Sequence, residues 1–318
     1  MTRVSLRFLF GVISLLVFFS CTSTRNLAPS LLESNCYVES DDLERDSSIY
    51  QFDEINPLLY NHFTERSIHL AHAIGVTQDL LEYIHLLENA EKTMDYKINL
   101  LTLRSKILQQ INIASLEISS VVAELDCEEE RVEQFANYFD KIERRVENRF
   151  TIAAIITGAT GAITAGLLAT NGNDVLAEQV GMATGVAEAF YGAYMIFYKR
   201  PSIEFMHDRN VLSDIWLAPK VSFLYPPSVW YYMNYTPKGS STNLNKLETL
   251  KRRWRNLSDL NGENKEVLEI IEKQFGKGGK FTADDFFTRS NMIDQLEAQI
   301  TLMKQDLVQL AIEIQGLD

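Results

Sequence analysis

The sequence has few of the residues that build metal centres or break helices. It contains three cysteines in 318 residues, with no CxxC pair and no cysteine/histidine pair at zinc-binding spacing. No proline or glycine lies between residues 76 and 157. Because these two residues end or weaken helices, such a span predicts long, coiled-coil-like helices.

Catalytic motifs are also lacking. Glu65, His69 and His72 share one predicted helical face, but His69 to His72 lacks the glutamate of HExxH and no second helix offers an obvious matching set. The glycine-rich run 276–282 does not fit the phosphate-loop pattern, and no GxSxG occurs. We therefore predict a non-enzymatic protein, with no catalytic residue, metal or cofactor and no evident small-molecule substrate.

The charge balance argues against another class of partner. The net charge is −13, and removal of residues 1–20 takes away only Arg3 and Arg7, which leaves −15. A chain this acidic repels phosphate backbones, so nucleic-acid binding is not expected. The basic run Lys246, Lys251 to Arg255 is interpreted as a solvated helix face.

The beginning of the chain has the pattern of an export signal. Arg3 and Arg7 precede the apolar run 8–19, which is too short to span a bilayer, so residues 1–20 are predicted to be a signal peptide. The run ends in Phe18-Phe19-Ser20-Cys21. An ordinary cleaved signal peptide with a chance cysteine is the alternative interpretation.

Phe18 to Cys21 resembles the lipobox of bacterial lipoproteins, although the two phenylalanines depart from its usual leucine and small residue. The resemblance implies a fatty-acid (palmitate) anchor on Cys21 and a place in the bacterial cell envelope. With no Asp at position 22, it favours the outer membrane facing the periplasm.

An acidic arm, residues 21–54 with the lipidated end, is expected to follow the signal peptide. It contains Cys36, and Cys127 lies in a predicted helix. In an oxidising compartment these two thiols either form a disulfide or remain separate, and the sequence leaves both possibilities open.

Apolar spacing predicts the helices of a single domain, residues 55–318. Steps of three and four residues indicate an amphipathic helix over about 60–91, followed by long helices through 98–125 and 132–146.

The segment 150–198 has the pattern of two apolar helices joined by a tight polar turn. Phe150 to Thr170 has no charged residue, and Val175 to Tyr198 is apolar apart from Glu178, Gln179 and Glu188. We expect an αα-hairpin whose small residues let the two backbones approach closely. The expected packing seam consists of Ala154, Gly158, Gly161, Ala165, Gly181, Gly185 and Gly192.

Two environments suit such a hairpin. A helix that is apolar all round is buried either in protein or in lipid. Because Glu188 lies in mid-span, we favour the core of a helical bundle over a bilayer.

The C-terminal third is less regular. Residues 202–240 are rich in aromatics and proline and are expected to be a packed loop or short strands covering the helices. Helices are predicted over 244–257 and 266–275, then a flexible loop over 276–280. Thr282 and Asp285 resemble a capping box, and Ser290 is a candidate cap for the final helix. Its predicted buried stripe is Ile293, Leu296, Ile300, Met303, Leu307, Leu310 and Ile314.

The predicted fold is mainly α, an elongated helical bundle with a Gly/Ala-rich apolar hairpin. The order of its elements is similar to that of the cytolysin A-type α-helical pore-forming proteins. We expect a structural or interaction lipoprotein that binds a protein partner or a second copy of itself through its long helices. The alternative is a membrane-active protein whose hairpin enters a bilayer.

Overall fold

The computed structural model describes residues 36–37, 56–89, 93–236, 244–257, 260, 262 and 264–317. The chain divides into two units, residues 1–38 and 39–318, and all described helices and strands belong to the second. The predicted signal peptide, Cys21 and most of the acidic arm lie outside the described residues. The described fold is mainly α, which confirms the predicted fold class.

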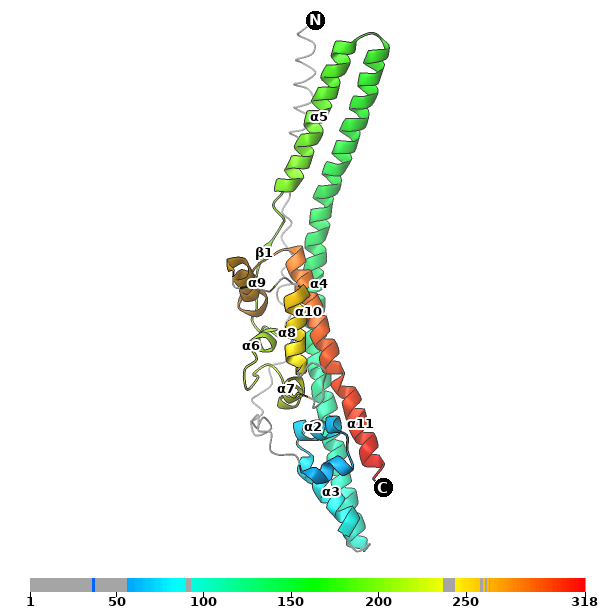
Figure 1. The fold of residues 1–318 in the computed structure, drawn as a ribbon, viewed down its shortest axis with the longest axis vertical. Helices are drawn as coiled ribbons and strands as arrows, with labels where there is room; N and C mark the ends of the chain where they lie inside the picture. The colour runs from blue at the N-terminus through cyan, green and yellow to red at the C-terminus, as the bar shows by residue number, and fades with distance from the viewer. Residues whose placement is uncertain are drawn as a thin grey trace. The chain divides into compact units, whose positions relative to one another are not determined.

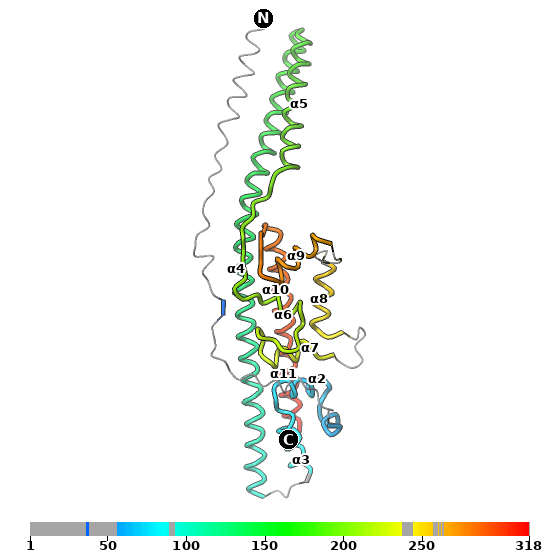
Figure 2. The backbone as a smooth tube through the Cα atoms, turned by 90° about the vertical axis from the view of Figure 1, so that its left-hand side faces the viewer, coloured from blue at the N-terminus to red at the C-terminus, as the bar shows by residue number. Residues whose placement is uncertain are grey.

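Helices and short strands follow one another along the second unit. Figures 1 and 2 show their arrangement. The elements are η3 (Pro57–Asn61), α2 (Glu65–Ala73), α3 (Thr77–Asn89), α4 (Met94–Thr170), α5 (Asp174–Phe197), β1 (Ile203–Met206), α6 (Ser213–Leu217), α7 (Pro227–Asn234), α8 (Lys246–Leu257), α9 (Lys265–Phe275), β2 (Gly278–Phe281), α10 (Ala283–Thr301) and α11 (Met303–Gln315).

Helix α4 is the element against which most of the others are arranged. Its 77 residues, at 1.5 Å each, give a length of about 115 Å. The Thr93 side chain caps its first turn by accepting from the Tyr96 N–H. Helices α3, α10 and α11 lie alongside it, and α5 folds back along its C-terminal part (Figure 1). The two long helical runs and the first limb of the predicted hairpin are thus one unbroken helix.

The predicted helix 60–91 is wrong in one respect, because the chain turns within it. Helix α2 ends at Ala73 and α3 begins at Thr77. Between them Gly75 has a φ of +75°, a left-handed conformation that favours glycine. The Val76 N–H donates to the Ala71 carbonyl and closes the turn.

The loop predicted over 276–280 is also wrong in part, because β2 pairs antiparallel with β1. Gly278 lies opposite Met206 with a φ of +111°, and a Cβ there would lie 2.2 Å from the Phe205 carbonyl oxygen. Only glycine fits this close approach. The paired strands β1 and β2 place Phe205 and Phe281 over the α4–α10 interface.

Aromatic side chains fill the centre of that interface. Phe286 of α10 stacks on Phe135 of α4 with ring centroids 5.2 Å apart, and Phe205 meets both rings edge-on. All three side chains are buried. Residues 202–236, the described part of the predicted cover region, contribute to the core through β1, α6 and α7, which bury Phe205, Ile215 and Trp230.

The last helical region begins earlier than Ser290. Thr282 and Asp285 form the predicted capping box, so α10 starts at Ala283. The final helix is divided at Leu302, and α11 begins at Met303. The predicted buried stripe is nonetheless confirmed across both helices by the burial of Ile293, Leu296, Ile300, Met303, Leu307, Leu310 and Ile314.

A fully buried arginine of α10 joins this core to the end of α9 and to the segment between β1 and α6. The Arg289 guanidinium donates to the Gln274 carbonyl at 2.7 Å and to Asn210 Oδ1 at 3.0 Å. Asn210 in turn donates to the carbonyls of Gln274 and Gly276. Burial lowers the pKa of Arg289 to about 10, so it stays charged at neutral pH.

Replacement of Arg289 by alanine is expected to lower the free energy of unfolding by about 3 kcal/mol, because it leaves a cavity and removes two buried, charge-assisted hydrogen bonds. Urea unfolding measures the change. Arg252→Ala, at an exposed position, is the matched control and should lose less than about 0.5 kcal/mol. Equal losses in the two variants would contradict this role of Arg289.

Candidate functional site: the exposed apolar hairpin

The hairpin consists of the C-terminal part of α4, the turn 171–173 and α5. The Asn171 side chain and backbone N–H both donate to the Leu167 carbonyl and close the end of α4. Gly172 follows with a φ of +75°, and Asp174 opens α5, where its negative charge is favourable at the helix N-terminus. The predicted tight polar turn between two helical limbs is confirmed.

Two of the predicted seam glycines lie where the helices are closest. A Cβ on Gly161 would come within 2.2 Å of Thr184 Cγ2, and one on Gly158 within 2.1 Å of Glu188 Oε1. The addition at Gly161, which would also lie 2.7 Å from Thr184 Cβ, would force the helices apart, whereas the one at Gly158 would displace the end of the Glu188 side chain. Ala154 and Ala165 of the predicted seam are half-buried on the same part of α4.

The predicted seam of α5 is wrong. A Cβ on Gly181, Gly185 or Gly192 would meet nothing within 4 Å, so these glycines face away from α4. The half-buried side of α5 has steps of three and four residues, as in a coiled coil, and includes residues large enough to fill the space beside small α4 residues. Its members are Ala177, Val180, Thr184, Ala187 and Tyr191.

The outer surface of the hairpin is apolar and exposed. Helix α5 has no buried residue, and Gly161 is the one buried residue in the hairpin part of α4. Among the described elements, α4 alone packs extensively on α5. The expectation that the hairpin forms a bundle core is therefore wrong for the described part of the chain. Its exposed large apolar residues are Ile152, Ile155, Ile156, Ile163, Leu167, Val175, Leu176, Met182, Val186, Phe190, Tyr194, Ile196 and Phe197.

Helix α4 is long and apolar enough to cross a membrane. The most apolar stretch of this helix has a mean hydropathy of 1.8, and only 6% of that stretch is buried. Length and composition alone are weak indications, because buried core helices share them. The low burial distinguishes this helix from such a core helix.

Aromatic side chains gather at the base of the hairpin. Phe150 of α4 stacks on Tyr194 of α5 with ring centroids 4.3 Å apart, and Tyr194 is 6.2 Å from Tyr198. Below these rings Arg200 forms an ion pair with Glu143 at 3.0 Å and another with Asp284 at the start of α10. These ion pairs connect the base of the hairpin to the helical body, and the side chains directly above the ion pairs are aromatic.

The other sequence-derived candidates lie elsewhere. Cys21 is outside the described residues, and Cys36 and Cys127 are each disulfide-bonded. His69 Nδ1 is 2.9 Å from the Tyr231 hydroxyl, and its ring stacks on Tyr235. The histidine face considered for a metal is thus packed against tyrosines.

Lys246 belongs to the predicted basic helix but is not simply solvated. It lies beside a groove of about 280 Å³, with Nζ 3.9 Å from the Tyr232 ring centroid and 4.1 Å from that of Tyr235. Burial lowers the pKa of Lys246 to about 8. Sequence spacing gave no indication of this, because the two rings come from α7 and the segment that follows it.

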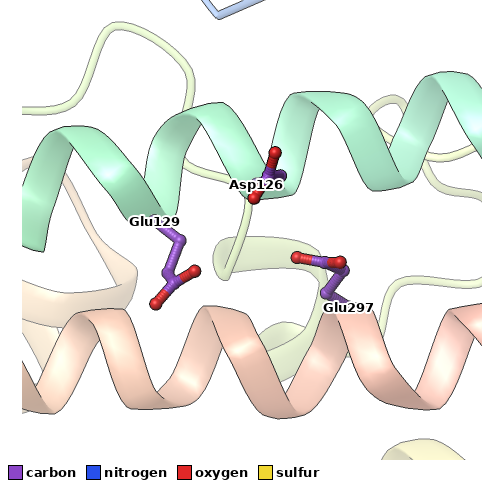
Figure 3. Close-up of side chains that lie close together, drawn as sticks. All are labelled: Asp126, Glu129 and Glu297. Atoms are coloured by element: carbon purple, nitrogen blue, oxygen red, sulfur yellow. The ribbon is translucent and has the colours of Figure 1, made fainter.

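Three carboxylates from two helices also meet on the surface of the body. Asp126 and Glu129 of α4 face Glu297 of α10, with one oxygen from each within 4.8 Å of the others (Figure 3). Burial, followed by the charges of Asp126 and Glu129, raises the pKa of Glu297. Carboxylate oxygens are hard-cation ligands, but exposed acidic groups often cluster without a metal.

Comparison of the chain with protein-family models, with curated proteins and with solved structures finds no match.

The raised pKa of Glu297 has a consequence for stability. Protonation of Glu297 favours the folded state, so its contribution is present below the unfolded pKa of about 4.3 and is lost as the pH rises through the folded value. Glu297→Gln is therefore expected to raise the melting temperature at pH 8 by at most about 3 °C, since exposure screens the repulsion.

At pH 4 the same variant should melt close to the wild type, because Glu297 is then largely protonated. Thermal unfolding followed by circular dichroism at the two pH values tests this. Glu269→Gln, an exposed carboxylate on α9, is the control for the loss of one negative charge. A lower melting temperature for Glu297→Gln at pH 8 would contradict the repulsion.

Proposed function

We propose that the protein is a non-enzymatic, membrane-active lipoprotein whose hairpin, residues 150–198, enters a lipid bilayer while the helical body stays outside. The single observation behind this proposal is the exposed apolar surface around both limbs of the hairpin. Soluble surfaces rarely expose contiguous apolar patches above a few hundred Å², and larger ones mark membrane or protein contacts.

The dimensions of the hairpin suit a bilayer. Phe150 to Thr170 comprises 21 uncharged residues, or about 31 Å of helix, and the hydrocarbon core is about 30 Å thick. The backbone groups of both limbs are satisfied within their own helices, as lipid requires. The Tyr194 and Tyr198 rings at the base fit the aromatic belt typical of a membrane interface.

Glu178 and Glu188 oppose insertion. A charged carboxylate at the bilayer centre costs about 2.5–3.5 kcal/mol on insertion scales. Burial of about a dozen large apolar side chains, each contributing about 1.5 kcal/mol or more when fully buried, exceeds that cost. We therefore expect insertion to be favourable but sensitive to Glu188, whose carboxylate lies against Gly158 in the seam.

The lipobox resemblance supports a position in the bacterial cell envelope, where a lipid on Cys21 would hold the protein to the periplasmic face of the outer membrane. In this proposal the lipid and the hairpin are two separate membrane attachments.

A second candidate function is that of a scaffold that associates through α4. An apolar stripe near the start of this helix is exposed and repeats at steps of three, four and seven residues, as in a coiled coil. It includes Met94, Ile98, Leu101 and Leu108. The membrane proposal is preferred because the hairpin exposes more apolar surface than this stripe.

The deciding experiment removes the lipid. We expect Cys21→Ala, exported behind a cleavable signal peptide, to remain in the membrane pellet after alkaline carbonate extraction. Adding Ile155→Asp and Val186→Asp on the outer faces of the hairpin should release it, whereas adding Leu268→Asp on exposed α9 should not. Release of Cys21→Ala itself would refute insertion and favour the tethered scaffold.

Replacement of Glu188 by glutamine should strengthen insertion, because the amide carries no charge into the bilayer. In the Cys21→Ala background, we expect the vesicle partition coefficient of Glu188→Gln to rise at least about tenfold at pH 7. Flotation with liposomes measures it. Glu269→Gln is the control, and an unchanged coefficient for Glu188→Gln would show that this carboxylate stays in water.

A further inference from the structure

The base of the hairpin is surrounded by basic side chains in an otherwise acidic protein. Five of them border the apolar limbs: Arg144, Arg145, Arg149, Lys199 and Arg200. Two are neutralised, because Arg144 pairs with Asp140 at 2.7 Å, and Arg200 pairs with Glu143 and Asp284. Arg145, Arg149 and Lys199 are exposed and form no ion pair among the described residues. We call these three residues the basic collar.

The antiparallel register places the three residues of the collar within about one helical turn of one another along the hairpin axis. Phe150 stacks on Tyr194, and Arg200 pairs with Glu143. The two limbs are antiparallel, so each step toward the C-terminus on α4 corresponds to a step toward the N-terminus on the returning limb. By this register Arg145 is level with Lys199, and Arg149 is four residues, about 6 Å, nearer the aromatic rings. Arg145 and Arg149, four residues apart, share one face of α4.

We propose that the basic collar binds the phosphates of anionic phospholipids at the surface of the bilayer that the hairpin enters. This inference rests on the proposed function and names the lipid class. The collar lies directly below the Phe150 and Tyr194 rings, where headgroups would be if those rings lie at the interface.

Charge complementarity is the reason for choosing an anionic lipid. Guanidinium groups bind phosphate oxygens with paired, charge-assisted hydrogen bonds. The nearby carboxylates of Asp140, Glu143 and Asp284 are already paired with arginines, which leaves Glu147 as the one opposing charge close to the collar on α4. The rest of the chain, with its large negative charge, would be repelled by the same surface.

The test uses the Cys21→Ala protein exported behind a cleavable signal peptide, so that neither a lipid anchor nor the apolar run 8–19 contributes. Flotation compares vesicles of pure phosphatidylcholine with vesicles containing an equimolar share of phosphatidylglycerol. We expect the wild-type collar to favour the anionic vesicles, and Arg145→Gln/Arg149→Gln/Lys199→Gln to reduce binding to them by about 100-fold at low salt. Binding to neutral vesicles should change little.

Two further variants separate local contact from overall charge. Arg252→Gln/Arg253→Gln/Lys280→Gln removes the same number of exposed charges from α8 and β2 and should keep the anionic preference. Arg145→Lys/Arg149→Lys should retain most of it. Circular dichroism verifies that all variants are folded, which is expected because the exchanged side chains are exposed.

The outcomes distinguish this inference from the proposed function. If the wild type enters both kinds of vesicle equally, or if the collar and control variants lose binding equally, the inference is overturned and insertion stands. If no vesicle captures the wild type, the inference and the proposed insertion both fail. A loss confined to the collar variant on anionic vesicles supports both.

Discussion

The structure depends on one constraint, which is that α4 continues without a break for 77 residues. A helix of this length gains little from propensity alone and needs packing along its sides. The first two thirds obtain it from α3, α10, α11 and the aromatic cluster around Phe135 and Phe286. The last third obtains it from α5 alone among the described elements, and only on one side. The helix therefore runs from a buried environment into one that lacks a protein partner.

That change of environment explains why the proposed function concerns lipid. From Ile118 to Phe139, α4 buries apolar side chains on one face and exposes polar and charged side chains on the other, as expected for a helix in water. Beyond Arg149 the charged positions disappear while the apolar side chains remain exposed. The ion pairs of Arg200 with Glu143 and Asp284 lie at the boundary and join it to α10. The proposed insertion of the hairpin into a lipid bilayer accounts for all of these features together.

Local signals in the sequence predicted the features that are local in the structure. The absence of helix breakers predicted α4, Thr282 and Asp285 predicted the start of α10, and apolar spacing predicted the stripe through Leu307. The polar turn predicted the two limbs of the hairpin. Each depends on residues within a few turns of one another, so spacing alone is informative.

Contacts between residues that are far apart in the chain could not be predicted from the spacing of residues in the sequence. Pairing of β1 with β2 brings Met206 to Gly278, and the acidic cluster brings Asp126 to Glu297. Which face of α5 meets α4 was also undetermined, because a glycine stripe and a stripe containing Thr184 both have helical spacing. Side-chain volume decides between the two stripes, because the small residues of α4 leave room for larger side chains on α5.

The uninterrupted helix also sets a rotational relation between the body and the hairpin. Each residue of an α-helix turns the chain by about 100°, so the direction in which α5 faces is fixed by the number of residues between Phe135 and Gly158. Insertion of one residue near Arg149 would swing the hairpin about a quarter-turn around the axis of α4. Insertion of seven would nearly restore the original facing while moving it about 10 Å farther from the body. Length changes in this segment would therefore be tolerated by heptads rather than one residue at a time.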